Sequence, residues 1–276
     1  MRVLVAVDME GIAGITSATE VMPGTSEYGR LRALMTAEAN AAVAGAFDAG
    51  AAQVTVTDAH DRMRNLLYEQ LDDRAHLVSG PVRPLDMVQG AADADCAVFL
   101  GFHSPAGTPR STLAHTLSVT VRRLELDGVV MGETELGAAV CASFGVPVAL
   151  VTGDDALARH LSRSMPATPT LVVKESLAYA TARARPRAEV LESIRAATRA
   201  AVAAPPPPPP PPPTPVRVSL EFLHPALIEM VAMIPTVAAE DPATVTFTAP
   251  DVVRAVQVVS LCTLVAEESM HAANLW

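Results

Sequence analysis

The sequence predicts an α/β fold with a mostly parallel sheet, flanking helices and a small α+β part at the C-terminal end. Three short runs, residues 3–7, 54–57 and 97–100, are β-branched or almost entirely apolar, as is typical of strands buried on both faces of a parallel sheet. Between the first two lies an alanine-rich stretch with apolar residues at helical spacing, closed by Gly50. Strand, helix and strand in this order indicate a βαβ unit with parallel strands.

The following segments extend this pattern. Residues 115–130 alternate as strands do and contain Asp127-Gly128, a two-residue hairpin-turn signal. The further elements expected before the proline-rich segment are a helix over 133–144, a strand over 148–152, a helix after Asp154 and Asp155, and a helix over 186–203.

Residues 205–213 are nine consecutive prolines, followed by Thr214 and Pro215. Such a run adopts polyproline II and spans about 28 Å at about 3.1 Å per residue. We interpret it as a stiff surface connection, with a ligand for a proline-recognition domain as the alternative. It divides the chain into an α/β domain (1–204), a connection (205–215) and a small α+β segment (216–276) that packs on the first domain.

Strands over 216–222 and 243–249 and an amphipathic helix over 251–270 are expected in that last segment.

Composition excludes several classes of protein. The net charge is −10, from 20 basic and 30 acidic side chains with no basic cluster, which argues against nucleic acid or an anionic membrane as a partner. The apolar runs are too short for a membrane span, and the first run meets Asp8 without a signal-peptide cleavage site. Cys96, Cys141 and Cys262 lie far apart among apolar neighbours, as expected of thiols in a reducing cytoplasm.

Acids and histidines follow the three apolar runs. They are Asp8 and Glu10 after the first run, Asp58 and His60 after the second, and His103 after the third. The carboxyl ends of parallel strands share one edge of a sheet, where the ligand crevices of open α/β sheets form. Together with Glu133, which opens a predicted helix, two imidazoles and three carboxylates make a ligand set for zinc.

The charge of this set favours two ions. The carboxylates of Asp8, Glu10 and Glu133 carry three negative charges, which two divalent cations and one hydroxide would balance, whereas one ion would leave the carboxylates mutually repulsive. Two neighbouring ions also lower the pKa of a shared water and stabilise a tetrahedral intermediate. Asp8, at the strand tip, is the candidate bridging ligand, and Mn²⁺ or Co²⁺ could replace Zn²⁺.

Taken singly, these residues have structural explanations. Asp8 and Glu10 would suit a turn before glycine, each histidine could be a hydrogen-bonded loop residue, and Glu133 is an ordinary first-turn acid. Asp58 could cap a helix, although we expect it to orient His60 from behind the metal. The metal site is favoured because the strand ends converge.

His115 lies in STLAHTLSV, at the expected start of the hairpin strand and a short loop after His103. If this loop returns over the crevice, His115 is placed as a general acid/base or nucleophile. A structural strand-start histidine would explain the spacing equally well. The remaining histidines are interpreted as structural or surface residues: His76, His160, His224 and His271.

Eight segments occur in a familiar order: VDMEGIAG, RLRALMTAEAN, TVTDAH, SGPVRPLDMVQG, FLGFH, AHT, MGETELGA and VTGDDA. In this order they resemble the zinc-dependent D-aminopeptidase family, whose founding member belongs to a bacterial dipeptide-transport operon. The resemblance covers most of residues 1–175 and resumes at VSLEF and in the last helix. It implies the metal ligands Asp8, Glu10, His60, His103 and Glu133, and it implies that His115 is catalytic.

The resemblance also implies two zinc ions per subunit and removal of an N-terminal D-residue, typically D-alanine, from short peptides. It further implies a large homo-oligomeric ring with the sites facing an internal chamber. Two parts depart from the family pattern: the loop over 104–114, which would border the site and affect substrate choice, and the proline run.

Two other functions would use some of the same residues. A haloacid-dehalogenase-like Mg²⁺ phosphatase would use Asp8 as nucleophile, but it needs an aspartate where Glu10 stands and a lysine before the later acidic pair. The sole lysine, Lys174, follows that pair. A non-catalytic, metal-stabilised binding protein would keep its function without His115, whereas a hydrolase would lose turnover and keep its metal. Whether His115 or an activated water is the nucleophile stays open.

Overall fold

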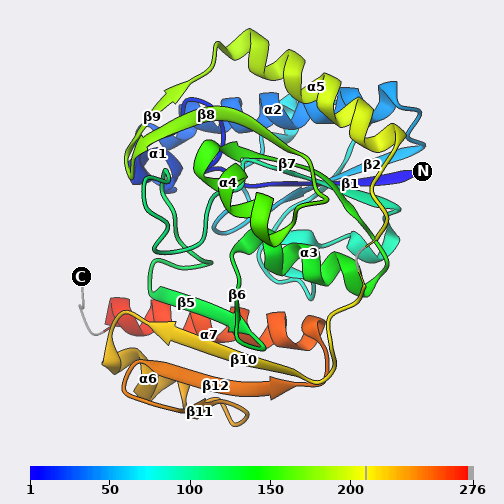
Figure 1. Cartoon of the computed structure of the whole chain (residues 1–276). Helices are drawn as coiled ribbons and strands as arrows, with labels where there is room; N and C mark the ends of the chain where they lie inside the picture. The colour runs from blue at the N-terminus through cyan, green and yellow to red at the C-terminus, as the bar shows by residue number, and fades with distance from the viewer. Residues whose placement is uncertain (209, 273–276) are drawn as a thin grey trace.

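The computed structural model describes residues 1–208 and 210–272, which form two sheets with helices between and around them (Figure 1). The larger sheet has seven strands in the order β3-β2-β1-β4-β7-β8-β9. Its strands are β1 (Arg2–Val7), β2 (Gln53–Asp58), β3 (His76–Val78), β4 (Cys96–Leu100), β7 (Val148–Asp154), β8 (Thr170–Ala178) and β9 (Thr181–Ala184). Every pairing in it is parallel except that of β9 with β8.

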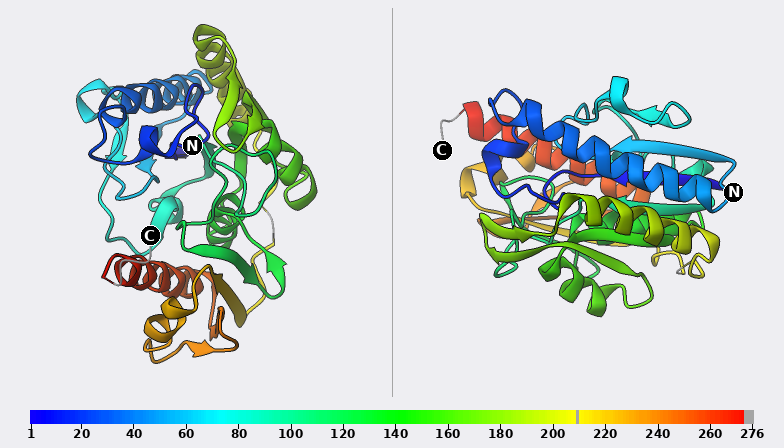
Figure 2. Two further views of the ribbon diagram at one scale, coloured as in Figure 1. Left: turned by 90° about the vertical axis from the view of Figure 1, so that its left-hand side faces the viewer. Right: turned by 90° about the horizontal axis from the view of Figure 1, so that it is seen from above.

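Helices cover both faces of this sheet. On one face, α2 (Tyr28–Asp48) and α5 (Arg187–Ala203) lie side by side (Figure 2) and share a core with Val3, Val5 and Val7 of β1. The alternate β1 residues, Leu4 and Ala6, belong to the core of the opposite face, with α3 (Glu133–Ser143) and α4 (Asp155–Ser164). Burial on both faces explains why residues 3–7 of β1 and the whole of β4 are continuous apolar runs.

The smaller sheet is antiparallel, in the order β11-β12-β10-β5-β6. Its strands are β5 (Val121–Leu126), β6 (Val129–Val130), β10 (Val216–Phe222), β11 (Ala238–Ala239) and β12 (Thr244–Ala249). The helices α6 (Pro225–Val231) and α7 (Val252–Ala272) pack against it, and α7 also contacts α3. Asp127 and Gly128 join β5 to β6 with φ angles of 50° and 79°, as the predicted two-residue turn requires.

Short helical segments complete the chain: α1 (Ala18–Val21), η1 (Tyr68–Gln70), η2 (Asp86–Val88) and η3 (Ala91–Asp93). None of the described helices is both long and apolar enough to cross a membrane.

The predicted α/β fold with a small α+β part is confirmed, with two local differences. The sequence did not predict the strands β3, β8, β9 and β11 or the helix α6; β3 and β9 are the two edges of the larger sheet. The hairpin strand begins at Val121 and not near residue 115, because Leu113 and Leu117 have φ angles of 55° and 61° that an extended strand does not allow. His115 therefore lies in a loop.

The smaller sheet joins segments from both sides of the proline run, since β10 pairs with β5. The division into residues 1–204, 205–215 and 216–276 stays a prediction. Two parts of these ranges, Pro209 and residues 273–276, lie outside the described residues.

Candidate metal centre

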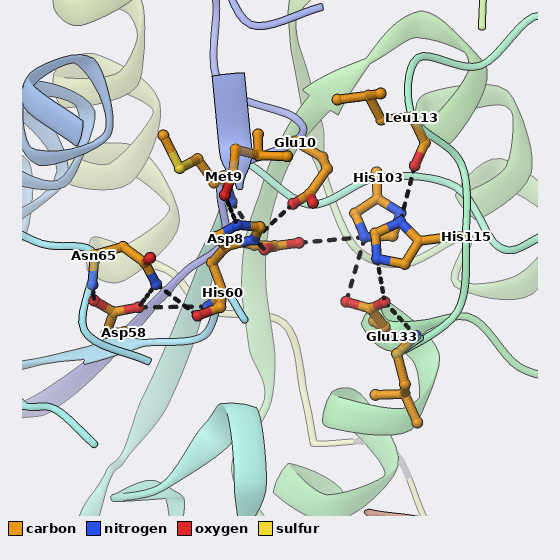
Figure 3. Close-up of polar contacts among 12 residues, drawn as sticks. Asp8, Met9, Glu10, Asp58, His60, Asn65, His103, Leu113, His115 and Glu133 are labelled. Carbon is orange, nitrogen blue, oxygen red and sulfur yellow. Dashed lines mark hydrogen bonds and ion pairs between the residues drawn. The ribbon is translucent and has the colours of Figure 1, made fainter. Parts of the chain in front are cut away.

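The candidate residues meet at the carboxyl ends of three adjacent strands. In the register of the large sheet, Val7 of β1 lies opposite Asp58 of β2 and Leu100 of β4. The residues that follow these positions therefore gather at one edge, where α3 also begins (Figure 3). All five predicted ligands are brought together there and are buried: Asp8, Glu10, His60, His103 and Glu133.

Asp8 lies between the two predicted histidine ligands. Its Oδ1 is 3.3 Å from His60 Nδ1, and its Oδ2 is 3.4 Å from His103 Nε2. Glu10 Oε2 approaches the same nitrogen of His60 at 3.0 Å, and Glu133 Oε2 approaches the same nitrogen of His103 at 3.3 Å. One carboxylate oxygen toward each histidine is the arrangement expected of a bridging ligand.

Each of the three site histidines has one ring nitrogen facing a main-chain carbonyl. The pairs are His60 Nε2 with Val21 O at 2.8 Å, His103 Nδ1 with Ser104 O at 3.0 Å, and His115 Nδ1 with Leu113 O at 2.9 Å. A carbonyl oxygen accepts but does not donate, so the facing nitrogen carries the hydrogen. In a neutral ring the other nitrogen then turns a lone pair toward the carboxylates, an arrangement that a bound cation would stabilise.

His115 completes the site from the loop that follows β4. Its ring stacks on that of His103, with centroids 4.1 Å apart and planes 9° from parallel. Its Nε2 lies 3.7 Å from Glu133 Oε1. The His115 side chain is 20% exposed, whereas that of Glu133 is 5% exposed and that of His103 is 1% exposed. His115 is therefore the group that an incoming molecule would meet first.

Asp58 acts on His60 through the main chain. Its carboxylate accepts hydrogen bonds from the backbone of Asn65 at 2.5 Å and Leu66 at 2.7 Å, and from the Asn65 amide at 2.7 Å. The His60 amide lies 3.4 Å from Asp58 Oδ1. Asp58 thus fixes the loop that carries His60, while Val21 holds the ring itself.

Burial and mutual charge shift the pKa values of the acids and imidazoles. Burial and the neighbouring Glu10 raise the pKa of Asp8 to about 8. Burial alone would lower the pKa of His103, but Glu133 and Asp8 outweigh it and raise that pKa to about 10. Burial and the nearby His103 lower the pKa of His115. The centre therefore attracts positive charge strongly, and His115 is the imidazole that stays neutral.

The residues fit a divalent cation. Asp8 Oδ2, Glu10 Oε2 and His103 Nε2 are buried and make no hydrogen bond within the described residues. Such atoms are costly to bury unless something binds them. Two triads have ligand atoms within 4.8 Å of one another: Asp8, Glu10 and His103, and His103, His115 and Glu133. Carboxylate oxygens and imidazole nitrogens are the ligands of zinc.

Sequence reasoning missed residues that support the site from a distance. The Asp154 carboxylate accepts hydrogen bonds from Ser111 Oγ at 3.1 Å and Thr112 N at 2.9 Å, and so anchors the loop that carries His115. Lys174 reaches the segment after Glu10. The sequence features that could have indicated these residues are an acid at the end of a predicted strand, Asp154, and a single lysine in an apolar run, Lys174.

Two of the other histidines have structural contacts away from the site. His160 contacts Glu135 at 2.5 Å, and His224 caps α6.

The sequence model of the D-aminopeptidase family (Peptidase M55) matches residues 1–261. The chain belongs to the D-aminopeptidase family. A D-aminopeptidase of Bacillus subtilis (strain 168) is 39% identical over 178 residues, an alignment that covers 64% of this chain and 65% of the relative. The chain thus spans just under two thirds of that relative in sequence.

A solved structure of the family agrees over almost the whole chain. The Zn-dependent D-aminopeptidase DppA from Bacillus subtilis, a self-compartmentalizing protease, is similar with a TM-score of 0.93 and 33% identity. The superposition covers 97% of this chain and 98% of that one.

Proposed function

We propose that this protein is a zinc-dependent aminopeptidase that removes the N-terminal residue, a D-amino acid such as D-alanine, from short peptides. Membership of the D-aminopeptidase family supports the reaction, and the Zn-dependent structural relative supports the metal. The observation that carries the proposal is the gathering of three buried carboxylates and three histidines at one sheet edge, with buried ligand atoms that make no hydrogen bond within the described residues.

Two ions per chain suit this arrangement. Glu10, His60 and one oxygen of Asp8 would hold the first, and the other oxygen of Asp8, His103 and Glu133 would hold the second. When bound, the ions would neutralise the carboxylates and polarise the scissile carbonyl. The same donors would accept Mn²⁺ or Co²⁺.

His115 is suited to move the proton of the reaction. Its Nδ1 faces the Leu113 carbonyl, so Nε2 is free to accept a proton from an attacking water and to return it to the leaving amine. The lowered pKa keeps this nitrogen unprotonated near neutral pH. The same lone pair would serve if His115 attacked the carbonyl directly.

The assembly and compartment are part of the proposal. The self-compartmentalizing relative supports a large homo-oligomeric ring that admits short peptides to enclosed sites. Three buried free cysteines support the cytoplasm as the compartment. Light scattering of the purified protein tests the ring: a mass many times that of one chain is expected, and a monomer would contradict it.

Paired dipeptide assays test the reaction. Metal content is measured beside release of D-alanine from D-Ala-D-Ala and of L-alanine from L-Ala-L-Ala. We expect about two zinc per chain and D-selective release. If the protein binds metal but releases no amino acid from either peptide, the proposed substrate class is wrong. Hydrolysis of p-nitrophenyl phosphate by such a protein would favour the phosphatase alternative.

A further inference from the structure

The chain's sole lysine is a fully buried residue of β8 whose ammonium contacts main-chain carbonyls of one loop. Lys174 is 0% exposed. Its Nζ donates hydrogen bonds to the carbonyl oxygens of Glu10, Ile12 at 3.1 Å and Ile15 at 2.7 Å. All three ammonium hydrogens are thus used by the segment that leaves β1 and carries Glu10.

The opposite side of this segment is also fixed. Gly11 N donates to Gly101 O at 2.7 Å, and a Cβ on Gly11 would lie 2.0 Å from the Phe102 carbonyl oxygen. The main chain of β4's end therefore touches the main chain after Glu10. Between this contact and the ammonium of Lys174, the backbone on both sides of Glu10 has little room to move.

A third contact holds the middle of the segment. Glu38 of α2 is buried, and its Oε1 accepts a hydrogen bond from Ala13 N at 2.9 Å. Two side chains, Glu38 of α2 and Lys174 of β8, thus bind the donors and acceptors of residues 10–15.

Burial of an ammonium is costly unless its hydrogen bonds are satisfied. An apolar side chain would fill this part of the core without that cost, yet it would remove a donor from three carbonyls of the segment. The Ile12 carbonyl would keep its hydrogen bond from Ile15 N at 3.2 Å, whereas those of Glu10 and Ile15 would lose the side-chain donor that they share with it. The Glu10 side chain extends from this backbone to place Oε2 3.0 Å from His60 Nδ1. Removing a hydrogen bond to a ligating side chain typically changes metal affinity by about 10–100-fold. Lys174 acts one step further from the metal, on the main chain that carries the Glu10 side chain.

We propose that Lys174 is a positioning residue, which fixes residues 10–15 so that the Glu10 carboxylate meets His60 in the metal centre. This inference rests on the proposed metal-dependent function. It assigns Lys174 no contact with substrate; its effect on the metal passes through the main chain of Glu10.

The test compares Lys174→Met with Ile194→Ala in the full-length protein. Methionine keeps the length of the side chain and removes its donors. Ile194 is fully buried in α5, in the core on the same face as Val173, so its truncation lowers stability and removes no hydrogen bond to residues 10–15. Thermal unfolding shows whether the two variants are destabilised similarly. Affinity for Zn²⁺ by chelator competition and the visible absorption spectrum of the Co²⁺ form report the metal centre.

Lys174→Met should bind one of its ions about ten-fold or more weakly and show an altered Co²⁺ spectrum. Ile194→Ala should keep both properties of the wild type. Lys174→Gln, which retains a shorter donor, should fall between wild type and methionine and replaces it if that variant does not fold. Unchanged affinity and spectrum in the Lys174 variants would overturn the proposal.

The same samples distinguish a failure of the proposed aminopeptidase reaction from a failure of the proposed role of Lys174. A wild type that binds metal without releasing D-alanine would overturn the proposed reaction and leave the Lys174 comparison intact. A wild type that binds no metal would overturn both.

Discussion

His115 is the site residue whose loss should separate turnover from metal binding. Replacing it with alanine removes the group that we propose to move the proton, and such groups contribute about 10²–10⁴-fold to rate. We therefore expect His115→Ala to reduce kcat by about that factor. Its metal content, measured by mass spectrometry, should stay that of the wild type. The matched control is His76→Ala, which replaces an exposed histidine of β3. Loss of metal along with activity would make His115 a ligand.

Because of Glu38, the free energy of unfolding should fall as pH rises. Burial raises the pKa of Glu38 to about 8, despite the hydrogen bond from Ala13 and the charge of Lys174. The folded state then keeps a proton that the unfolded state has lost. The stabilisation is therefore complete below the pKa of the unfolded chain and is lost as pH rises toward about 8, by at most about 1.4 kcal/mol per pH unit.

Urea unfolding between pH 5 and pH 8 measures this effect. Glu38→Gln keeps an acceptor for Ala13 and should have a flatter profile than the wild type. Glu192→Gln, on the exposed side of α5, should follow the wild type. Parallel profiles for all three proteins would show that Glu38 does not titrate in this range.

At the level of elements, the ends of β1 and β4 are packed too closely to accept a side chain at Gly11. An added Cβ would lie 2.0 Å from Phe102 O and 2.5 Å from Gly101 C, whereas Gly29 in α2 has nothing within 4 Å. We expect Gly11→Ala to lower the free energy of unfolding by more than about 2 kcal/mol and to weaken metal binding. Gly29→Ala should be neutral or stabilising by about 0.5–1 kcal/mol. Equal stability of the two variants would contradict this packing.

The elements that sequence predicts best are those whose local pattern agrees with their burial. The β1 and β4 runs are apolar because both sheet faces are covered, and their ends therefore predict where Asp8 and His103 meet. The loop before β5 was not predictable in this way. Its path depends on positive φ angles at two leucines and on the distant carboxylate of Asp154. The contacts of Lys174 likewise join residues far apart in the chain.

At the scale of the whole molecule, the smaller sheet depends on both sides of the proline run. Leu124 of β5 and Leu220 of β10 are fully buried in the core that α7 covers. A protease site inserted within residues 205–213 tests this dependence. After cleavage the two fragments should elute together in size-exclusion chromatography, because the β5–β10 pairing persists. Separate elution of a folded 1–204 fragment would show an independent first domain.

The most direct measurement of the central claim is an anomalous difference map from crystals of the zinc-loaded protein, collected at the zinc absorption edge. Two peaks are expected: one among Glu10, His60 and Asp8, the other among Asp8, His103 and Glu133. The Asp8 carboxylate should lie between them. A single peak would contradict the bridging role of Asp8, and the absence of any peak at this sheet edge would contradict the metal centre itself.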